Sequence, residues 1–189
     1  MRRRTLLQTI VSTLPLLPMA RVRLSAQVRR LTPESVAMLH EVGGTVLPAS
    51  IGTDRVSLIV DRFVAWAHEY EEGVALAHGY GHPRLAKAAA SPVPDYIAQL
   101  SALGAAASAR GGAFSSLSLD VRRTLLTEAL ASAKVTDLPS RPAGRHVVAD
   151  LMAYYFRSSE ANDQAYRARI GRQVCRPLAL TTRRPAPLA

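Results

Sequence analysis

Apolar residues recur at helical spacing from Thr32 onward, and the first such stretch has clear ends. Thr32-Pro33-Glu34 combines a favourable N-cap residue, a proline at the first helical position and an acid near the positive end of the helix dipole. Apolar residues follow every three or four positions as far as Val46, and Pro48 ends the pattern. The pair Gly43-Gly44 lies inside this stretch, and it either weakens the helix or lets another backbone approach closely.

Four more stretches with this spacing predict four more helices. In each of them the apolar residues form one stripe, which a globular domain buries. No stretch alternates cleanly with period two while carrying the β-branched residues typical of strands. We therefore expect an all-α protein, a single small helical domain with long loops. The predicted helices begin at Asp54, near Asp95, at Ser118 or Asp120, and near Val147.

Two segments do not fit these helices. Between Gly73 and Pro94 the chain is rich in glycine, histidine and proline, which predicts a long connection with one short helix around residues 84–90. Near the C-terminus, three prolines accompany paired arginines, and these cannot continue a helix. Residues 175–189 are therefore expected to form an extended Pro/Arg-rich tail, which is either disordered or laid along a partner.

The net charge of +10 is concentrated at the two ends of the chain. Residues 1–30 carry +7 and residues 141–189 carry +6, whereas residues 31–140 carry −3. A nucleic-acid-binding domain typically spreads its basic groups along its folded elements. The distribution therefore argues against nucleic acid as the partner, and each basic end needs its own explanation.

The basic N-terminal segment has the layout of an export signal. Arg3-Arg4 are followed by threonine, two leucines and glutamine, which resembles the twin-arginine pattern of two arginines, any residue, two hydrophobic residues and a polar residue. The apolar run that follows is weak, and Ala26 offers a cleavage point. A mitochondrial transit peptide and an uncleaved membrane anchor are the alternatives. We interpret residues 1–26 as a twin-arginine signal and residues 27–189 as the domain that reaches the periplasm.

The twin-arginine route carries proteins that are already folded. A folded passenger usually has a cofactor inserted in the cytoplasm or a partner that travels with it. The sequence lacks the motifs that would hold such a cofactor in this chain. The segment from His78 to Arg84 supplies only the first two glycines of a dinucleotide-binding loop, and neither a Gly-x-Ser-x-Gly elbow nor a Walker loop is present. We expect no catalytic or cofactor-binding residue in this chain.

Three histidines are candidates for a metal site: His68, His78 and His82. A spacing of four places two imidazoles on one helix face, but Gly-Tyr-Gly between His78 and His82 indicates a loop. No carboxylate at a comparable spacing completes a set of three ligands. We therefore expect no metal site, and the alternative function is a free-standing exported enzyme or metal-binding protein that uses these histidines.

Cys175 is the single cysteine. In an oxidising compartment an unpaired cysteine is a quiet thiol, a reactive thiol or half of an intermolecular disulfide. Arg172 and Arg176 flank it, and neighbouring cations favour the reactive thiolate. The sequence alone leaves these possibilities open.

The C-terminal third carries a resemblance to a known family. Residues 150–172, followed by Cys175-Arg176-Pro177-Leu178, resemble the C-terminal signature of the gluconate 2-dehydrogenase subunit 3 family. Residues 31–49 resemble the first helix of that family, and the stretch from Trp66 to Gly81 is also similar. The resemblance spans about residues 31–178, and its specificity lies in the C-terminal segment.

This resemblance implies a small accessory subunit of a membrane-associated sugar or polyol dehydrogenase. In such complexes the large partner is a flavoprotein of the glucose–methanol–choline type, which holds FAD, often with a cytochrome c subunit that passes electrons onward. The large partner commonly lacks a signal of its own, so the twin-arginine peptide of the small subunit exports both. The Arg3-Arg4 pattern agrees with that role. The substrate of the large subunit does not follow from this chain.

The same C-terminal segment has the composition of a protein interface. It holds four of the ten aromatic residues of the chain, interspersed with arginines, and tyrosine and arginine are enriched at interface hot spots. We expect one helix face in the core, with the arginines and the tail on the partner. The predicted partner-binding residues are Tyr154, Arg157, Tyr166, Arg167, Arg169, Arg172 and Arg176, with Cys175 as a candidate for an intermolecular disulfide.

Overall fold

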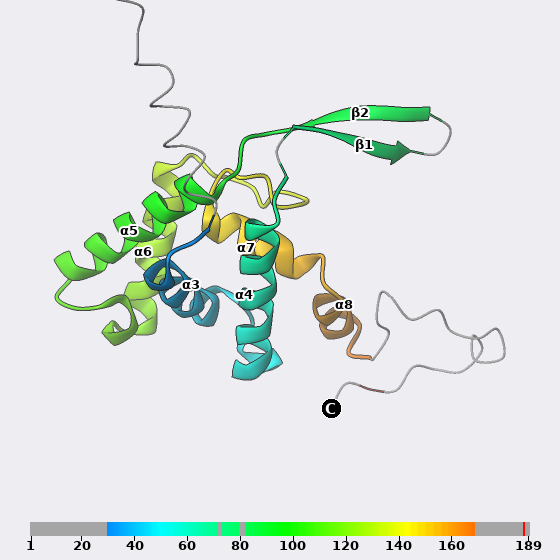
Figure 1. Ribbon diagram of the computed structural model, residues 1–189. Helices are drawn as coiled ribbons and strands as arrows, with labels where there is room; N and C mark the ends of the chain where they lie inside the picture. Colours follow the sequence, from blue (N-terminus) through cyan, green and yellow to red (C-terminus); the bar gives the residue numbers. More distant parts are fainter. Residues whose placement is uncertain (1–29, 72, 80–81, 169–186, 188–189) are drawn as a thin grey trace, which may run out of the picture.

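The computed structural model describes residues 30–71, 73–79, 82–168 and Pro187. This part of the chain is mostly helical, which confirms the all-α class (Figure 1). The signal interpretation of residues 1–26 and nearly all of the predicted tail lie outside the described residues. In chain order the elements are α3 (Pro33–Val46), η1 (Ala49–Ile51), α4 (Thr53–His68), β1 (Gly73–Gly79), β2 (His82–Ala88), α5 (Val93–Ala109), η2 (Phe114–Ser116), α6 (Leu119–Ser132), α7 (Val147–Phe156) and α8 (Ser159–Tyr166).

Two helix starts lie where the sequence predicts them. The side chain of Thr32 accepts a hydrogen bond of 3.2 Å from the N–H of Ser35 at the start of α3. Ser118 does the same for α6, with the N–H of Val121 as the donor at 3.4 Å. Each cap satisfies one of the free N–H groups at a helix start. The helix predicted to begin at Asp54 begins at Thr53, and Gly52 rather than Asp54 occupies its N-cap position, with a φ of 83° that favours glycine.

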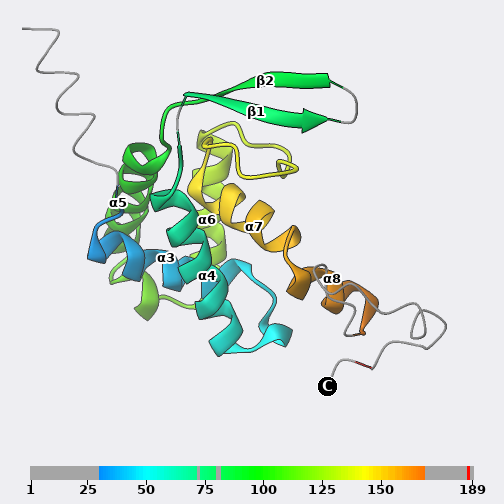
Figure 2. The ribbon, with the colours of Figure 1, turned by 45° about the vertical axis from the view of Figure 1, so that its right-hand side comes forward.

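Helix α3 lies in the middle of the helical body, and α4, α5, α6 and α7 all contact it (Figures 1 and 2). Gly43 permits the contact with α4, because a Cβ atom at this position would lie only 2.5 Å from Cγ2 of Val60. A Cβ atom on Gly44 would instead meet nothing within 4 Å among the described residues. Of the two explanations for the glycine pair, close approach of another helix therefore applies to Gly43.

The core consists of the apolar stripes of these helices. Phe63, Tyr96, Phe114 and Tyr155 are fully buried, and each such aromatic side chain contributes about 1.5–3 kcal/mol on burial. Most of the other buried side chains are leucine, valine and isoleucine. In the described part of the chain, no helix is long and apolar enough to cross a membrane.

Residues 73–79 and 82–88 form a pair of β-strands that extends away from the helices (Figures 1 and 2). β1 and β2 pair antiparallel, with Leu76 opposite Leu85. The predicted short helix around residues 84–90 is therefore wrong, because β2 occupies most of this range. Six of the fourteen residues in the two strands are glycine or alanine, and the strands contain one β-branched residue, Val74. A ribbon outside any larger sheet has no buried face to impose a period-two pattern.

The helix predicted near Val147 is α7, and a further short helix, α8, follows it. α7 ends at Phe156, and the side chain of Ser158 then caps α8 by accepting a hydrogen bond of 3.1 Å from the N–H of Ala161. α8 lies at the far end of α7 from the pair of β-strands (Figure 1). The interruption between Phe156 and Ser159 changes which residues of α7 and α8 share a helix face.

Candidate functional site

The structure places four of the predicted partner-binding residues, Tyr154, Arg157, Tyr166 and Arg167, on α7, on α8 or directly after these helices. The other predicted residues cannot be placed. Arg169, Arg172, Arg176 and Cys175 lie outside the described residues, as do Arg3 and Arg4.

Tyr154 belongs mainly to the fold. Its ring lies edge-on to Phe63 at a centroid distance of 5.7 Å and tilted against Trp66 at 6.4 Å. Burial raises the pKa of the Tyr154 hydroxyl, although nearby Arg62 opposes this shift. Since the ring is half-buried between α7 and α4, Tyr154 offers a partner only part of its surface.

The exposed residues of this region are Phe156, Arg157, Tyr166 and Arg167, here named the α7–α8 surface. Phe156 is 55% exposed and Tyr166 is 67% exposed, which is high for large aromatic side chains. Arg157 reaches back to the carbonyl oxygen of Ser140 at 3.5 Å. Arg167 follows α8 with a left-handed backbone, at a φ of 48°. The α7–α8 surface therefore combines two exposed aromatic rings with two exposed guanidinium groups.

Phe156 is exposed, although the sequence pattern did not single it out as a surface residue. The sequence allowed it to be a core residue beside Tyr155, but only Tyr155 is buried. Neighbours in a helix point about 100° apart, so Tyr155 is buried while Phe156 is largely exposed, although the two rings remain in contact at a centroid distance of 5.2 Å. Leu151 and Tyr155 lie four positions apart and share the buried face of α7, whereas Phe156 lies five positions from Leu151 and falls outside that face.

Helix α8 is fixed to the helical body by polar contacts. Arg62 on α4 contacts Glu160 at 2.8 Å, and the amide of Gln164 donates a hydrogen bond of 2.7 Å to the hydroxyl of Ser50. Burial alone would raise the pKa of Glu160, but hydrogen bonds from its own backbone N–H and from Arg62 outweigh burial and lower it. The α7–α8 surface therefore has a defined position relative to α4.

A buried polar network holds the other end of α7. The carboxylate of Asp150 is fully buried and accepts hydrogen bonds from the Tyr96 hydroxyl at 2.8 Å and the Ala143 N–H at 2.7 Å. The side chain of Gln99 on α5 accepts from the Val147 N–H at 2.7 Å and donates to the Arg145 carbonyl at 3.2 Å. The network joins α5 to the start of α7. It fills no cleft and is structural, since its polar atoms satisfy one another.

The structure gives His68 a role in the fold. Its Nε2 atom accepts a hydrogen bond of 3.0 Å from the N–H of Leu31, so the lone pair that a metal would need is already used. Burial lowers the pKa of His68, and the neighbouring Arg30 lowers it further. This side chain is a neutral acceptor in the folded protein.

His78 and His82 lie on the two paired strands, with Gly79 opposite His82 and His78 opposite Pro83. The helical spacing that would place two imidazoles on one face therefore does not apply to them. Within the described residues, no group of three or more histidine, cysteine, aspartate or glutamate side chains could hold a metal ion.

Comparison with known proteins identifies no relative. No family model, no curated protein and no solved structure matches this chain. The resemblance of residues 31–178 to the gluconate 2-dehydrogenase subunit 3 family therefore stays a prediction from the sequence motifs.

Proposed function

We propose that this protein is the non-catalytic small subunit of a periplasmic, membrane-associated flavin dehydrogenase that acts on a sugar or polyol. In this role it exports and stabilises the large subunit, which holds FAD. The observation that carries the proposal is the α7–α8 surface, whose exposed aromatic rings and guanidinium groups belong to the segment that resembles the accessory-subunit family.

The composition of this surface supports protein binding over catalysis. Aromatic side chains and arginine dominate the binding energy of protein interfaces. Large aromatic rings such as Phe156 and Tyr166 expose apolar area that a partner would cover. The surface is also anchored by the Arg62–Glu160 ion pair, and a pre-ordered surface loses less entropy on binding.

The N-terminal sequence supports the export part of the proposal. Arg3-Arg4 and the residues that follow resemble a twin-arginine signal, and this route accepts folded complexes. A large subunit without its own signal would cross the membrane bound to this chain. The complex, with a cytochrome c subunit where one is present, would supply the membrane association.

The alternative of a metal-dependent enzyme has less support. It requires His68 as a ligand, and the Nε2 atom of His68 is occupied by the Leu31 N–H. No observation on the described residues favours catalysis by this chain.

Affinity purification of the tagged full chain from the periplasmic fraction of its host tests the proposal. We expect a flavin-containing dehydrogenase to co-purify in a fixed ratio. The double variant Phe156→Ala/Tyr166→Ala should weaken this association at least about 30-fold, as expected for the loss of about 2 kcal/mol at an interface hot spot. Leu58→Ala is the matched control, because Leu58 is 44% exposed on α4 and lies outside the α7–α8 surface.

The export part is tested by changing Arg3 and Arg4 together to lysine. This chain and the flavoprotein should then both remain in the cytoplasm. If the flavoprotein still reaches the periplasm, the escort role is wrong. If no flavoprotein co-purifies with the unchanged chain, the accessory-subunit role itself is wrong.

A further inference from the structure

Gly44 has no explanation within the fold. It lies in the last turn of α3, where glycine is less favourable than alanine. Its φ is not positive, and a Cβ atom there would meet nothing within 4 Å among the described residues. Its neighbour Gly43 differs, because α4 packs against it. Glycine also serves where another molecule approaches a backbone closely. The space beside Gly44 is open to such an approach.

That space is a groove of about 510 Å³ between the C-terminal end of α3, α6 and α7. Its volume lies in the range of ligand-binding clefts and accommodates several side chains. Apolar side chains form most of its walls, and Leu119 at its edge is 40% exposed. The groove is lined by residues 44–49 and by Leu119, Arg123, Leu126, Thr127, Leu130, Val148 and Met152.

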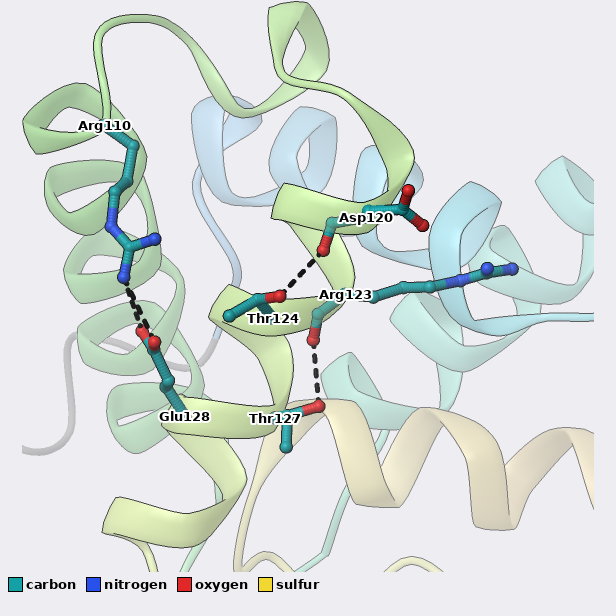
Figure 3. Close-up of polar contacts among 6 residues, drawn as sticks. All are labelled: Arg110, Asp120, Arg123, Thr124, Thr127 and Glu128. Carbon is teal, nitrogen blue, oxygen red and sulfur yellow. Dashed lines mark hydrogen bonds and ion pairs between the residues drawn. The ribbon is translucent and has the colours of Figure 1, made fainter.

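Arg123 is the only ionisable residue in this lining. Figure 3 shows its side chain extended away from α6, on a different side of the helix from the Arg110–Glu128 ion pair. Within the described residues its guanidinium makes no ion pair, not even with Asp120 one turn earlier. The hydroxyl of Thr127 donates a hydrogen bond of 2.9 Å to the backbone carbonyl of Arg123. This bond does not involve the guanidinium group. An occupant with a carboxylate would complement this cation.

We propose that this groove receives an amphipathic helix of the large subunit, with apolar side chains in the groove and a carboxylate against Arg123. The inference rests on the proposed function and adds a second contact surface to the α7–α8 surface. It corresponds to the helix-in-groove mode of recognition, in which apolar residues at intervals of three and four anchor the helix.

The shape of the groove favours a helix as the occupant. Leu119, Arg123 and Leu130 line it along α6 over about 16 Å, at a rise of 1.5 Å per residue. This is the length of about three helical turns. The missing side chain of Gly44 then removes bulk where the backbone of a second helix would cross α3.

The charge of the chain argues against its own remaining segments as occupants. Residues 1–29 carry six arginines and no acid, and residues 169–189 carry five arginines and no acid. Both segments would bring like charge to Arg123. An acidic helix of a partner would bring opposite charge to Arg123, whereas these two segments would bring like charge.

The test uses the full chain in complex with the co-purified flavoprotein. Gly44→Leu fills the groove, and Arg123→Glu reverses its charge. We expect each variant to weaken capture of the flavoprotein at least tenfold while retaining the circular dichroism and melting behaviour of the unchanged chain. Arg55→Glu, on an exposed position of α4 outside the groove, is the matched charge control and should bind normally.

A photo-crosslinking residue in place of Leu119 identifies the occupant. We expect a crosslink to a large-subunit segment that is helical, amphipathic and acidic. A crosslink to this chain, to a second copy or to no protein overturns the inference. Undiminished capture by both groove variants also overturns it and leaves the proposed function intact, whereas failure of the unchanged chain to capture a flavoprotein overturns both.

Discussion

The hydroxyl of Tyr96 on α5 donates a hydrogen bond of 2.8 Å to the fully buried carboxylate of Asp150 on α7. The second donor to this carboxylate, the N–H of Ala143, comes from the loop that precedes α7. Burial raises the pKa of Tyr96, and the neighbouring Asp150 raises it further, so the hydroxyl keeps its proton and stays a donor. The pair thus joins α5, α7 and the loop at one point.

Replacing Tyr96 with phenylalanine should destabilise the protein. The change removes one of two donors to a buried carboxylate, which costs about 1–3 kcal/mol. Urea unfolding followed by circular dichroism measures the difference. Tyr155→Phe is the control, since Tyr155 is equally buried and its hydroxyl makes no hydrogen bond within the described residues. Equal effects of the two substitutions would contradict the importance of the Tyr96–Asp150 bond.

Stability should decrease as the pH falls below about 6.5, the ordinary pKa of histidine. Burial lowers the pKa of His68 and of His146 in the folded protein, although Asp150 opposes the shift of His146. The unfolded chain therefore binds protons more readily than the folded one, and stability is complete above that pH and lost as the pH falls toward the folded-state values. Melting temperatures between about pH 8 and pH 5 measure the slope. His68→Gln and His146→Gln should each flatten it, and an unchanged slope in both would contradict this assignment.

The two adjacent glycines of α3 should respond oppositely to alanine. Gly43→Ala places a Cβ atom 2.5 Å from Val60 and should cost about 1–3 kcal/mol, as overpacked cores do. Gly44→Ala meets nothing and should stabilise the chain by about 0.5–1 kcal/mol through helix propensity. Thermal unfolding of the isolated chain compares them. A destabilising Gly44→Ala would show that Gly44 serves the fold.

Cys175 lies outside the described residues, and its predicted disulfide stays a prediction. As the single cysteine it can form a disulfide only with another molecule. If it bonds the large subunit, denaturing electrophoresis of the complex without reductant should show one band at the summed mass, and two bands with reductant. Cys175→Ser should give two bands in both conditions. Two bands from the unchanged complex without reductant would assign Cys175 as a quiet thiol.

Deletion of residues 176–189 should weaken co-purification of the flavoprotein and leave the helical circular dichroism almost unchanged. Within the described residues the only pairing of this tail with the fold is one isolated β-bridge between Pro187 and Ala168. A single bridge contributes little to folding, and the Pro/Arg-rich composition of the tail fits an extended segment laid along a partner. A large loss of helicity on deletion would show instead that the tail stabilises the domain.

Features encoded by neighbouring residues could be predicted from the sequence. The caps Thr32 and Ser118 act on N–H groups three residues away, and the apolar stripes repeat within one helix. The pair of β-strands could not be predicted, because its small residues carry no strand pattern. The Tyr96–Asp150 bond joins residues 54 positions apart, and the Leu31–His68 bond joins residues 37 positions apart. Such pairs depend on how the helices pack, which periodicity does not specify.

Prediction of the α7–α8 surface was limited for the same reason. The composition of the segment 150–172 indicated an interface, but the break at Ser158 decides which residues face outward. Tyr154 packs against α4, whereas Phe156 is exposed. The groove beside Gly44 combines three helices from different parts of the chain, so the periodicity of single helices does not indicate it.

Under the proposed export role, the Leu31–His68 hydrogen bond would have a mechanical consequence when the chain is pulled by its N-terminus. Leu31 is buried and its N–H is held by the last residue of α4, directly before α3 begins. A pulling force on the residues before Leu31 would therefore act on both α3 and α4, because the hydrogen bond transfers part of the force to α4. A pull on the residues before Leu31 is therefore opposed by the bond to His68 before it reaches the first turn of α3.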